Sequence, residues 1–305
     1  MKETNMTALV SAFARAYHAR ADGPKVFDDP MAEALLVPGE FEKISRSMSA
    51  GIQFFNPAFQ GSPNEALRWI VGHQLAPTPL ARASFAETAL ENAVRLGARQ
   101  YLILGAGYDT FALRRPVWAE SLRIFELDRP AAFREKQERL RRAGIAAPEG
   151  TFFLEADFNE ADWQHVLTEC PAFSSGQRSF CSLLGLTYYY IPEETFCRLL
   201  ADLGALLLPG SALAFDYPCR EGSGSCGRRQ AALAAGAGEP MCAAYSLREM
   251  ETMLARCGFS IREHLDPPAL TARCFAAYNE AHPDHPMTAF EGVCCCLAVR
   301  QPDHR

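Results

Sequence analysis

The chain has 305 residues, a formal net charge of −6 and 22% charged residues. This balance provides neither the basic surface that nucleic-acid backbones require nor a basic face for an anionic membrane, so we expect neither partner. Hydrophobic residues make up 49% of the chain, enough for the core of one α/β domain with insertions. The N-terminus has no apolar signal-peptide core and no run of about 18 apolar residues occurs, which predicts a cytoplasmic protein.

Residues 1–90 have helical rather than strand-like patterns. The helical segments are Thr7–Arg20, Asp29–Leu36 and Phe85–Arg95, with loops rich in proline and glycine between them. We predict that this part of the chain forms a helical cap segment. It should pack over the ligand-binding edge of a sheet that residues 91–305 build.

From Gln100 onward, short apolar runs alternate with helical segments such as Ala131–Ala143 and Glu193–Leu203. The runs are Gln100–Leu104, Leu122–Leu127, Thr151–Ala156, Phe180–Leu186, Ala212–Asp216, Phe259–His264 and Val293–Val299. This alternation predicts an α/β fold with a doubly wound, seven-stranded, mostly parallel sheet. The last run follows a long irregular stretch and is the one expected to be antiparallel. An insertion at about 218–244 contains GSGSCG and AAGAGEP, a composition that indicates a mobile loop or lid.

The eleven cysteines all lie between Cys170 and Cys296. Their number is odd and no two have CxxC spacing, so the sequence predicts no metal site. Free thiols in this number are typical of a reducing compartment. Cys294, Cys295 and Cys296 are consecutive, and on a strand they would face alternate sides of the sheet as small buried side chains.

The first apolar run, QYLIL, leads directly into Gly105-Ala106-Gly107. Ligands of open α/β sheets bind at the carboxyl ends of strands, and glycines there let the backbone approach them closely. Thr110 stands where the dinucleotide fingerprint has its third glycine, and Asp109 would repel a pyrophosphate but tolerate a cation. Both features favour S-adenosylmethionine, which carries a sulfonium cation and no phosphate. A nicotinamide-dependent dehydrogenase is the alternative on the same kind of sheet.

Acidic residues stand at the ends of the next two runs. Glu126 and Asp128 follow the glycine loop by about 20 residues, where a carboxylate binds a ribose diol. They point to the same face, so one can bond the ribose while the other supports it. Asp157 and Phe158 end the third run, where the carboxylate can accept from the adenine amine and the ring can pack on the base. Three strand ends in order therefore predict one adenosine-binding edge.

These motifs, in their order and spacing, resemble the leucine carboxyl methyltransferase type of class I methyltransferases. The bacterial branch of small-molecule O-methyltransferases, related to the polyketide carboxyl methyltransferase of tetracenomycin synthesis, is the most similar. The resemblance covers nearly the whole chain and rests on Thr7-Ala8, Arg15-Ala16, Phe27-Asp28-Asp29-Pro30, Leu80-Ala81-Arg82-Ala83-Ser84-Phe85, Phe125-Glu126-Leu127-Asp128-Arg129-Pro130, Gly185-Leu186-Thr187-Tyr188-Tyr189, Phe215-Asp216-Tyr217, Gly238-Glu239-Pro240 and Gly258-Phe259.

The resemblance implies a cofactor site residue by residue. Arg82 would hold the methionine carboxylate of S-adenosylmethionine, because a guanidinium can pair with a carboxylate at two points, and Arg15 would be a second basic contact. The methionine part of the cofactor would lie over Gly105, Ala106 and Gly107, beside Asp109, and near Gly185 at the fourth strand end. Asp128 would bind the ribose, and Asp157 and Phe158 would contact the adenine. Tyr189 would face the transferred methyl group and the acceptor.

Leu184 departs from many relatives, which have a glutamate directly before the glycine that corresponds to Gly185. This departure favours the small-molecule branch over a protein C-terminal carboxyl methyltransferase, and it keeps a non-catalytic cofactor-binding protein as a further alternative. A carboxylate acceptor is already nucleophilic at neutral pH, whereas a phenol, with a pKa of about 10, would need a base, for which His73 is the candidate. We therefore expect an O-methyltransferase acting on a carboxylate, or a hydroxyl, of a small-molecule acceptor. The sequence carries no signature of that acceptor's identity or of the oligomeric state.

Overall fold

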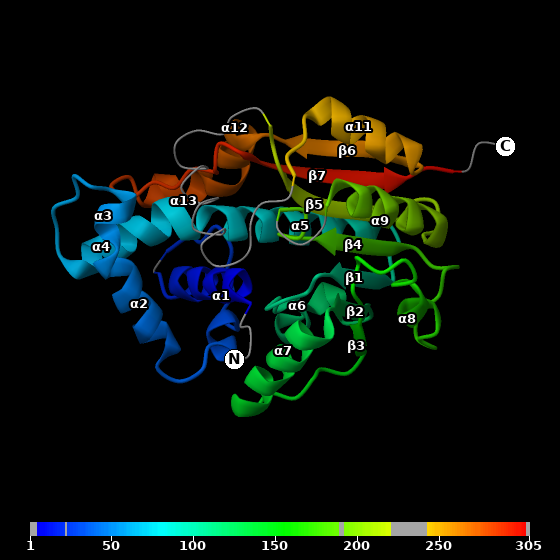
Figure 1. Cartoon of the computed structure of the whole chain (residues 1–305), viewed down its shortest axis with the longest axis horizontal. Helices are drawn as coiled ribbons and strands as arrows, with labels where there is room; N and C mark the ends of the chain where they lie inside the picture. The colour runs from blue at the N-terminus through cyan, green and yellow to red at the C-terminus, as the bar shows by residue number, and fades with distance from the viewer. Residues whose placement is uncertain (1–4, 22, 189–191, 221–242, 303–305) are drawn as a thin grey trace.

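The computed structural model describes residues 5–21, 23–188, 192–220 and 243–302. Its centre is a seven-stranded sheet in the order β3-β2-β1-β4-β5-β7-β6 (Figure 1). The strands are β1 (Gln100–Leu104), β2 (Arg123–Asp128), β3 (Thr151–Glu155), β4 (Ser179–Leu183), β5 (Ala212–Pro218), β6 (Phe259–Leu265) and β7 (Val293–Arg300). Strands β1 to β5 pair in parallel, whereas β7 is antiparallel to both neighbours. The predicted fold, including the antiparallel last strand, is confirmed.

The sheet is covered on both faces because its strands are apolar on both sides. Tyr101 and Ile103 belong to one buried cluster, and Leu102 and Leu104 to the other. The first cluster packs under α5 (Pro77–Arg95), and the second under α9 (Glu193–Leu206) and α11 (Leu247–Arg256). Successive side chains of a strand point to opposite faces of the sheet, so a parallel sheet that is covered on both faces requires apolar side chains at every position.

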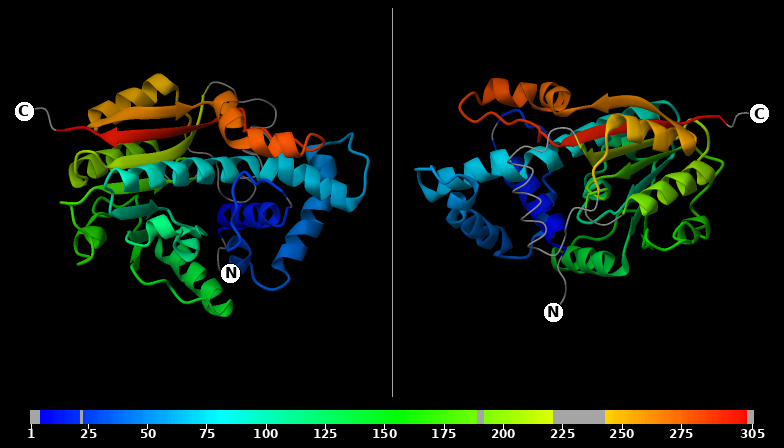
Figure 2. Two further views of the ribbon diagram at one scale, coloured as in Figure 1. Left: turned by 180° about the vertical axis from the view of Figure 1, so that it is seen from behind. Right: turned by 45° about the horizontal axis from the view of Figure 1, so that its top comes forward.

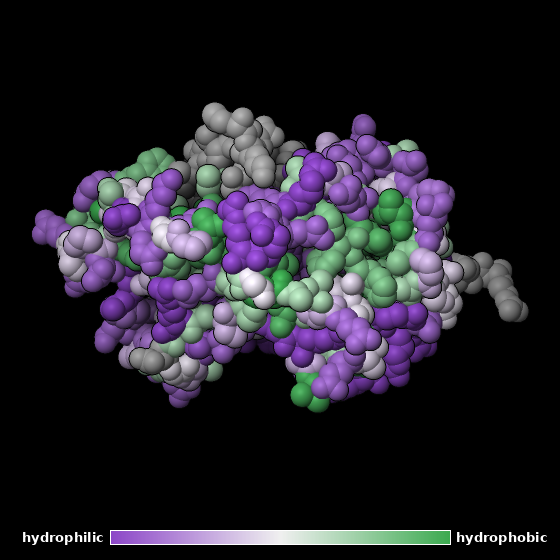
Figure 3. Space-filling model, turned by 90° about the horizontal axis from the view of Figure 1, so that it is seen from below, coloured by the Kyte–Doolittle hydropathy of each residue, from purple (hydrophilic) through white to green (hydrophobic). Residues whose placement is uncertain are grey.

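Strand β3 lies at one edge of the sheet, and most of its side chains are only half-buried. Figure 3 views the molecule from this side and shows hydrophobic surface gathered on the right half of the face among polar residues. The strands that carry the glycine loop and the β4 end lie further inside, so the centre of the sheet is shielded from solvent on both sides.

The N-terminal helices gather beyond the carboxyl ends of the parallel strands (Figures 1 and 2). They are α1 (Met6–Ala19), η1 (Ala32–Leu35), α2 (Glu40–Ala50), α3 (Ile52–Phe55), α4 (Pro63–Ile70) and the π-helical turn η2 (Val71–Leu75), which leads into α5. The boundary that we predicted at residue 90 falls inside α5. The edge of the sheet at the carboxyl ends of its parallel strands therefore faces helices from a distant part of the chain.

Two expectations about this segment were wrong. The helix predicted over Asp29–Leu36 is a single 3₁₀ turn, because Asp29 is turned inward to meet charged partners rather than to start a helix. Helices α2 and α4 were not predicted. Phe41, Ile44 and Met48 recur with helical spacing in α2, but few neighbours bury them and the preceding Pro38-Gly39 indicates a loop.

The remaining described helices are α6 (Phe111–Arg114), η3 (Val117–Ala119), α7 (Pro130–Arg142), α8 (His165–Thr168), α12 (Pro267–Leu270), η4 (Thr271–Phe275) and α13 (Ala276–Ala281). Most of the predicted insertion, 221–242, lies outside the described residues. Its two ends meet where Cys219 bridges to Tyr245.

The consecutive cysteines of β7 alternate as expected: Cys295 is buried in one cluster, and Cys294 and Cys296 in the other. In the described parts of the chain, no group of three His, Cys, Asp or Glu side chains is arranged to hold a metal ion. Within the same ranges, no helix has both the length and the apolar character needed to cross a bilayer.

Candidate functional site

A cavity of about 820 Å³ lies at the carboxyl ends of the parallel strands, between the sheet and the N-terminal helices. Its walls include ten of the residues predicted from the sequence, namely Arg15, Arg82, Gly105, Ala106, Gly107, Asp109, Asp128, Asp157, Phe158 and Gly185. These residues come from six separate elements or loops, so the fold brings together what the sequence separates by up to 170 positions.

The glycine loop turns sharply at the end of β1. Gly105 has a φ of +69°, a left-handed conformation that favours glycine, and a Cβ there would lie 2.8 Å from Leu186 Cδ1. The backbone N–H groups of Gly105 and Ala106 donate to Leu127 O at 2.8 and 3.1 Å, which fixes the loop to β2. Asp109 accepts from Phe111 N at 2.7 Å and thereby caps the start of α6.

The two acids of β2 have different roles. Asp128 lines the cavity, and its two carboxylate oxygens accept from Gly107 N at 2.6 Å and from Arg129 N at 2.7 Å. Each oxygen keeps a lone pair for a ligand hydroxyl. Burial raises the pKa of Asp128, although the two backbone hydrogen bonds oppose this shift. Glu126 is instead buried against Lys136 at 2.5 Å, so it supports the strand and does not line the cavity.

Asp157 and Phe158 follow β3 at the far side of the cavity. Asp157 Oδ1 accepts from the backbone and side-chain nitrogens of Asn159, both at 3.0 Å, which orients the carboxylate. The Phe158 ring is buried and meets Trp163 edge-on, with ring centroids 5.2 Å apart. This arrangement gives a fixed apolar ring beside a hydrogen-bond acceptor, as an adenine requires.

Arg82 reaches the cavity from α5 and lies over Gly185. Arg82 Nη1 is 3.3 Å from Asp216 Oδ2, and Asp216 Oδ1 accepts from Gly185 N at 2.7 Å. Gly185 has a φ of +75°, and a Cβ there would lie 2.6 Å from Arg82 Nη1. Asp216, at the end of β5, is fully buried and was not predicted as a site residue. The position of Asp216 at a strand end was the one signal that could have indicated a site residue. Its partner Arg82 stands 134 positions away in the sequence, so no local pattern indicated the pair.

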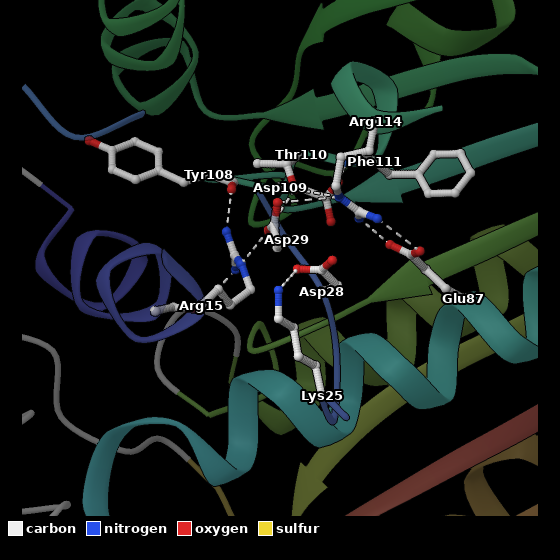
Figure 4. Close-up of polar contacts among 11 residues, drawn as sticks. Arg15, Lys25, Asp28, Asp29, Glu87, Tyr108, Asp109, Thr110, Phe111 and Arg114 are labelled. Atoms are coloured by element: carbon white, nitrogen blue, oxygen red, sulfur yellow. Dashed lines mark hydrogen bonds and ion pairs between the residues drawn. The ribbon is translucent and has the colours of Figure 1, made fainter. Parts of the chain in front are cut away.

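Arg15 is held by protein groups beside the glycine loop (Figure 4). Its Nη2 donates to Tyr108 O at 2.6 Å, and its Nε donates to Asp29 Oδ2 at 2.9 Å. The buried carboxylate of Asp29 also accepts from Thr110 Oγ1 at 2.7 Å. The N-terminal segment is therefore attached directly to the loop that follows β1.

Arg114 extends this ionic network to α5. It donates through both terminal nitrogens to the Glu87 carboxylate, and its Nε lies 3.3 Å from Asp29 Oδ1 (Figure 4). Burial raises the pKa of Glu87, which Arg114 opposes. Burial would lower the pKa of Arg114, but the hydrogen bond and charge of Glu87 outweigh it and raise the value. One network thus holds the N-terminal segment, α5 and α6 around the glycine loop.

Of the two predicted catalytic residues, His73 and Tyr189, the structure describes only His73. His73 is exposed, stacks on Trp69 with ring centroids 4.7 Å apart, and is absent from the cavity wall. Its position therefore gives no support to a role as a base. Tyr189 lies outside the described residues, whereas its neighbour Tyr188 is buried in the cavity wall.

The strand order with its single antiparallel strand, the glycine loop after β1 and the acid after β2 together define a class I methyltransferase. Residues 8–204 match the family model described as leucine carboxyl methyltransferase. The chain is 38% identical over 309 residues to "Putative S-adenosyl-L-methionine-dependent methyltransferase YktD" of Bacillus subtilis (strain 168), with 98% of this chain and 99% of that protein covered.

Solved structures agree with this fold. A DUF574 family protein from Streptomyces avermitilis MA-4680 has a TM-score of 0.59 at 16% identity, covering 96% of this chain and 97% of its own. A protein from Thermobifida fusca YX has a TM-score of 0.53 at 14% identity, covering 95% and 94%. The chain belongs to the leucine carboxyl methyltransferase family, and S-adenosylmethionine is its cofactor. The resemblance inferred from the sequence is confirmed.

Proposed function

We propose that this chain is an O-methyltransferase that transfers the methyl group of S-adenosylmethionine to a carboxylate of a small-molecule acceptor, with a hydroxyl as the second type of acceptor. The observation that carries this proposal is the composition of one cavity. It joins the strand-end residues Gly105, Asp128 and Asp157 to a wall of N-terminal helices, and no imidazole lines it in the described part of the chain.

Three features of the geometry support the proposed cofactor contacts. Gly105 and Gly185 let Leu186 and Arg82 pack directly against the turns that line the cavity, where a Cβ would collide with these side chains. Asp128 has a free lone pair on each oxygen, as two ribose hydroxyls need. The Arg82 guanidinium is the cation at the β4 end of the cavity and would take the methionine carboxylate.

The cofactor supplies an activated methyl group on sulfur. The protein's own contribution is alignment and the exclusion of water, since an in-line displacement needs the acceptor oxygen held behind the methyl carbon. A carboxylate needs no proton removed at neutral pH, because its reference pKa is about 4. The lack of an imidazole among the described wall residues therefore favours a carboxylate over a phenol.

The test has two arms. Calorimetry with S-adenosylhomocysteine should show binding, and a hundredfold excess over Kd should stabilise the fold by about 2.7 kcal/mol. Metabolite extracts incubated with the protein and methyl-labelled cofactor should yield labelled products in mass spectrometry. Methyl esters lose the label in mild alkali, whereas methyl ethers keep it. Label found only on nitrogen or sulfur would refute O-methylation, and no binding of S-adenosylhomocysteine would refute the cofactor site itself.

A further inference from the structure

The cavity has a second half that the cofactor contacts do not use. Strands β1, β2 and β3 lie on one side of β4 and carry the strand-end residues assigned to the cofactor. Other parts of the wall come from α2, α3 and η2 and, on the other side of β4, from the segments around β5 and β7. The apolar residues of this second half are Met48, Phe54, Phe55, Leu75, Phe290 and Val293. Arg82 and Gly185 stand between the two halves. The second half is therefore where an acceptor would lie.

This apolar wall is supported from behind. Phe55 is buried in a small cluster with Ile52, Ala66 and Ile70, and Met48 and Leu75 pack against the same cluster. Phe54 meets Phe55 edge-on, with ring centroids 5.2 Å apart. A wall with its own core keeps its shape, and a preformed apolar surface favours a hydrocarbon-rich ligand.

Four arginines of the described cavity wall face carboxylates of the protein, and one of them, Arg82, is also assigned to the methionine carboxylate. The pairs are Arg15 with Asp29, Arg114 with Glu87 and Asp29, Arg82 with Asp216, and Arg220 with Glu249 at 3.1 Å. Arg129 follows Asp128 on the cofactor side, and no lysine or histidine lines the cavity within the described ranges. A ligand with a second anionic group in the apolar half would lose its hydration without gaining a partner, which is costly.

One neutral polar side chain of the wall, Gln74, lies shortly before Arg82 in the chain. Gln74 lines the cavity, is 6% exposed, and lies in the π-helical turn before α5. Thr78 and Arg82 follow it at intervals of four and also line the cavity, so they form a polar stripe that leads to Gly185. Turns of π-helix are frequent at functional sites. An amide can donate to an acceptor oxygen without introducing charge.

We propose that the acceptor has an uncharged, hydrocarbon-rich body and a single carboxylate, and that Gln74 is the residue that orients this carboxylate toward the methyl group. This inference rests on the proposed function, because it assigns the second half of the same cavity. It excludes phosphorylated acceptors and dicarboxylic acids, since the described arginines of the wall already face carboxylates.

Binding to the full-length protein saturated with S-adenosylhomocysteine tests the acceptor class. The probes are decanoic acid and decanedioic acid, which have the same length and differ by one terminal carboxylate. We expect decanoic acid to bind at least tenfold more tightly. Equal affinities, or no binding of decanoic acid to a protein that does bind S-adenosylhomocysteine, would overturn the inference. Failure to bind S-adenosylhomocysteine would instead refute the proposed function.

The role of Gln74 is tested in the same assay with Gln74→Leu and Gln74→Glu. A lost hydrogen bond to a charged group corresponds to a loss of about tenfold or more in decanoic acid affinity, and the added charge of Gln74→Glu should weaken binding further. The Kd of S-adenosylhomocysteine should stay within twofold. Gln53→Leu, a change of the same type at an exposed residue outside the cavity, is the matched control. Unchanged decanoic acid affinity in both Gln74 variants would remove Gln74 from the acceptor site.

Discussion

The Asp29→Asn substitution should weaken both the fold and cofactor binding, although Asp29 lies on the N-terminal segment. Its carboxylate is 1% exposed and meets Arg15 at 2.9 Å, Arg114 at 3.3 Å and the Thr110 hydroxyl at 2.7 Å. The amide has nearly the same shape but no charge, and it presents N–H donors to groups that are themselves donors. Two guanidinium groups that are 11% and 13% exposed would then lack their shared anion.

The size of the effect follows from this burial. Removing one partner of a buried ion pair costs about 3–5 kcal/mol. Because Arg114 keeps Glu87 and Arg15 keeps Tyr108 O, we expect a loss at the lower end, about 3 kcal/mol. For a chain of this length that corresponds to a fall in Tm of about 6 °C. Tyr108 and Thr110 belong to the glycine loop, so the Kd of S-adenosylhomocysteine should rise about tenfold, the scale of one charged hydrogen bond.

The assay combines thermal unfolding without ligand and calorimetry with S-adenosylhomocysteine. Glu33→Gln is the matched control, since the Arg20–Glu33 pair joins the same part of the chain but is about half exposed on both sides. An exposed pair contributes about 0.2–1 kcal/mol, so this variant should bind cofactor as the parent does. The double variant Asp29→Asn/Arg15→Gln should lose less than the sum of its parts. An unchanged Kd in Asp29→Asn would show that the network stabilises the fold without shaping the cofactor loop.

Three further outcomes are expected. Asp128→Ala should raise the Kd of S-adenosylhomocysteine tenfold or more, because a hydrogen bond to a charged group contributes about 1.5–3 kcal/mol. Asp109→Ala should raise this Kd less, because Asp109 caps α6. Equal calorimetric Kd values for Asp128→Ala and the parent would show that the ribose binds elsewhere. Without ligand, Arg82→Lys should have a higher Tm than Arg82→Ala, since its cation still faces the buried Asp216. Both variants should raise the Kd of S-adenosylhomocysteine several-fold, because neither an ammonium nor a methyl group can form two parallel hydrogen bonds. Unchanged affinity in both variants would leave the partner of the methionine carboxylate unassigned. Burial lowers the pKa of His18 from 6.5 to about 4, so the folded protein binds this proton less readily than the unfolded chain does. The free energy of unfolding should therefore be highest above about pH 6.5 and fall toward pH 4. At pH 5 the loss should be about 2 kcal/mol. Urea unfolding at pH 7.5 and 5 should show a smaller decrease in His18→Gln than in the parent; the same decrease in both would assign the acid sensitivity to other groups.

The sequence by itself determined the sheet and which residues stand at its strand ends. Each strand is a local apolar run, and the residues that end or directly follow a strand can be read from the sequence, as at Gly105, Asp128 and Asp157. Parallel strands align their carboxyl ends, so residues that are far apart in the chain but each end a strand must meet at one edge. This is why eight of the ten predicted positions, all except the helical Arg15 and Arg82, line a single cavity.

Only the tertiary structure decided which of these side chains are available and what else surrounds them. Glu126 and Asp128 are alike in sequence, but the packing of α7 gives Glu126 a lysine partner and leaves Asp128 at the cavity. Arg82 meets Asp216 across 134 positions, and no local pattern encodes such a pairing. The proposed acceptor wall comes in part from helix α2, which has no fully buried residue and follows the loop-like Pro38-Gly39. These features depend on long-range packing, where a side chain's partner is set by how whole elements dock rather than by its neighbours in the chain.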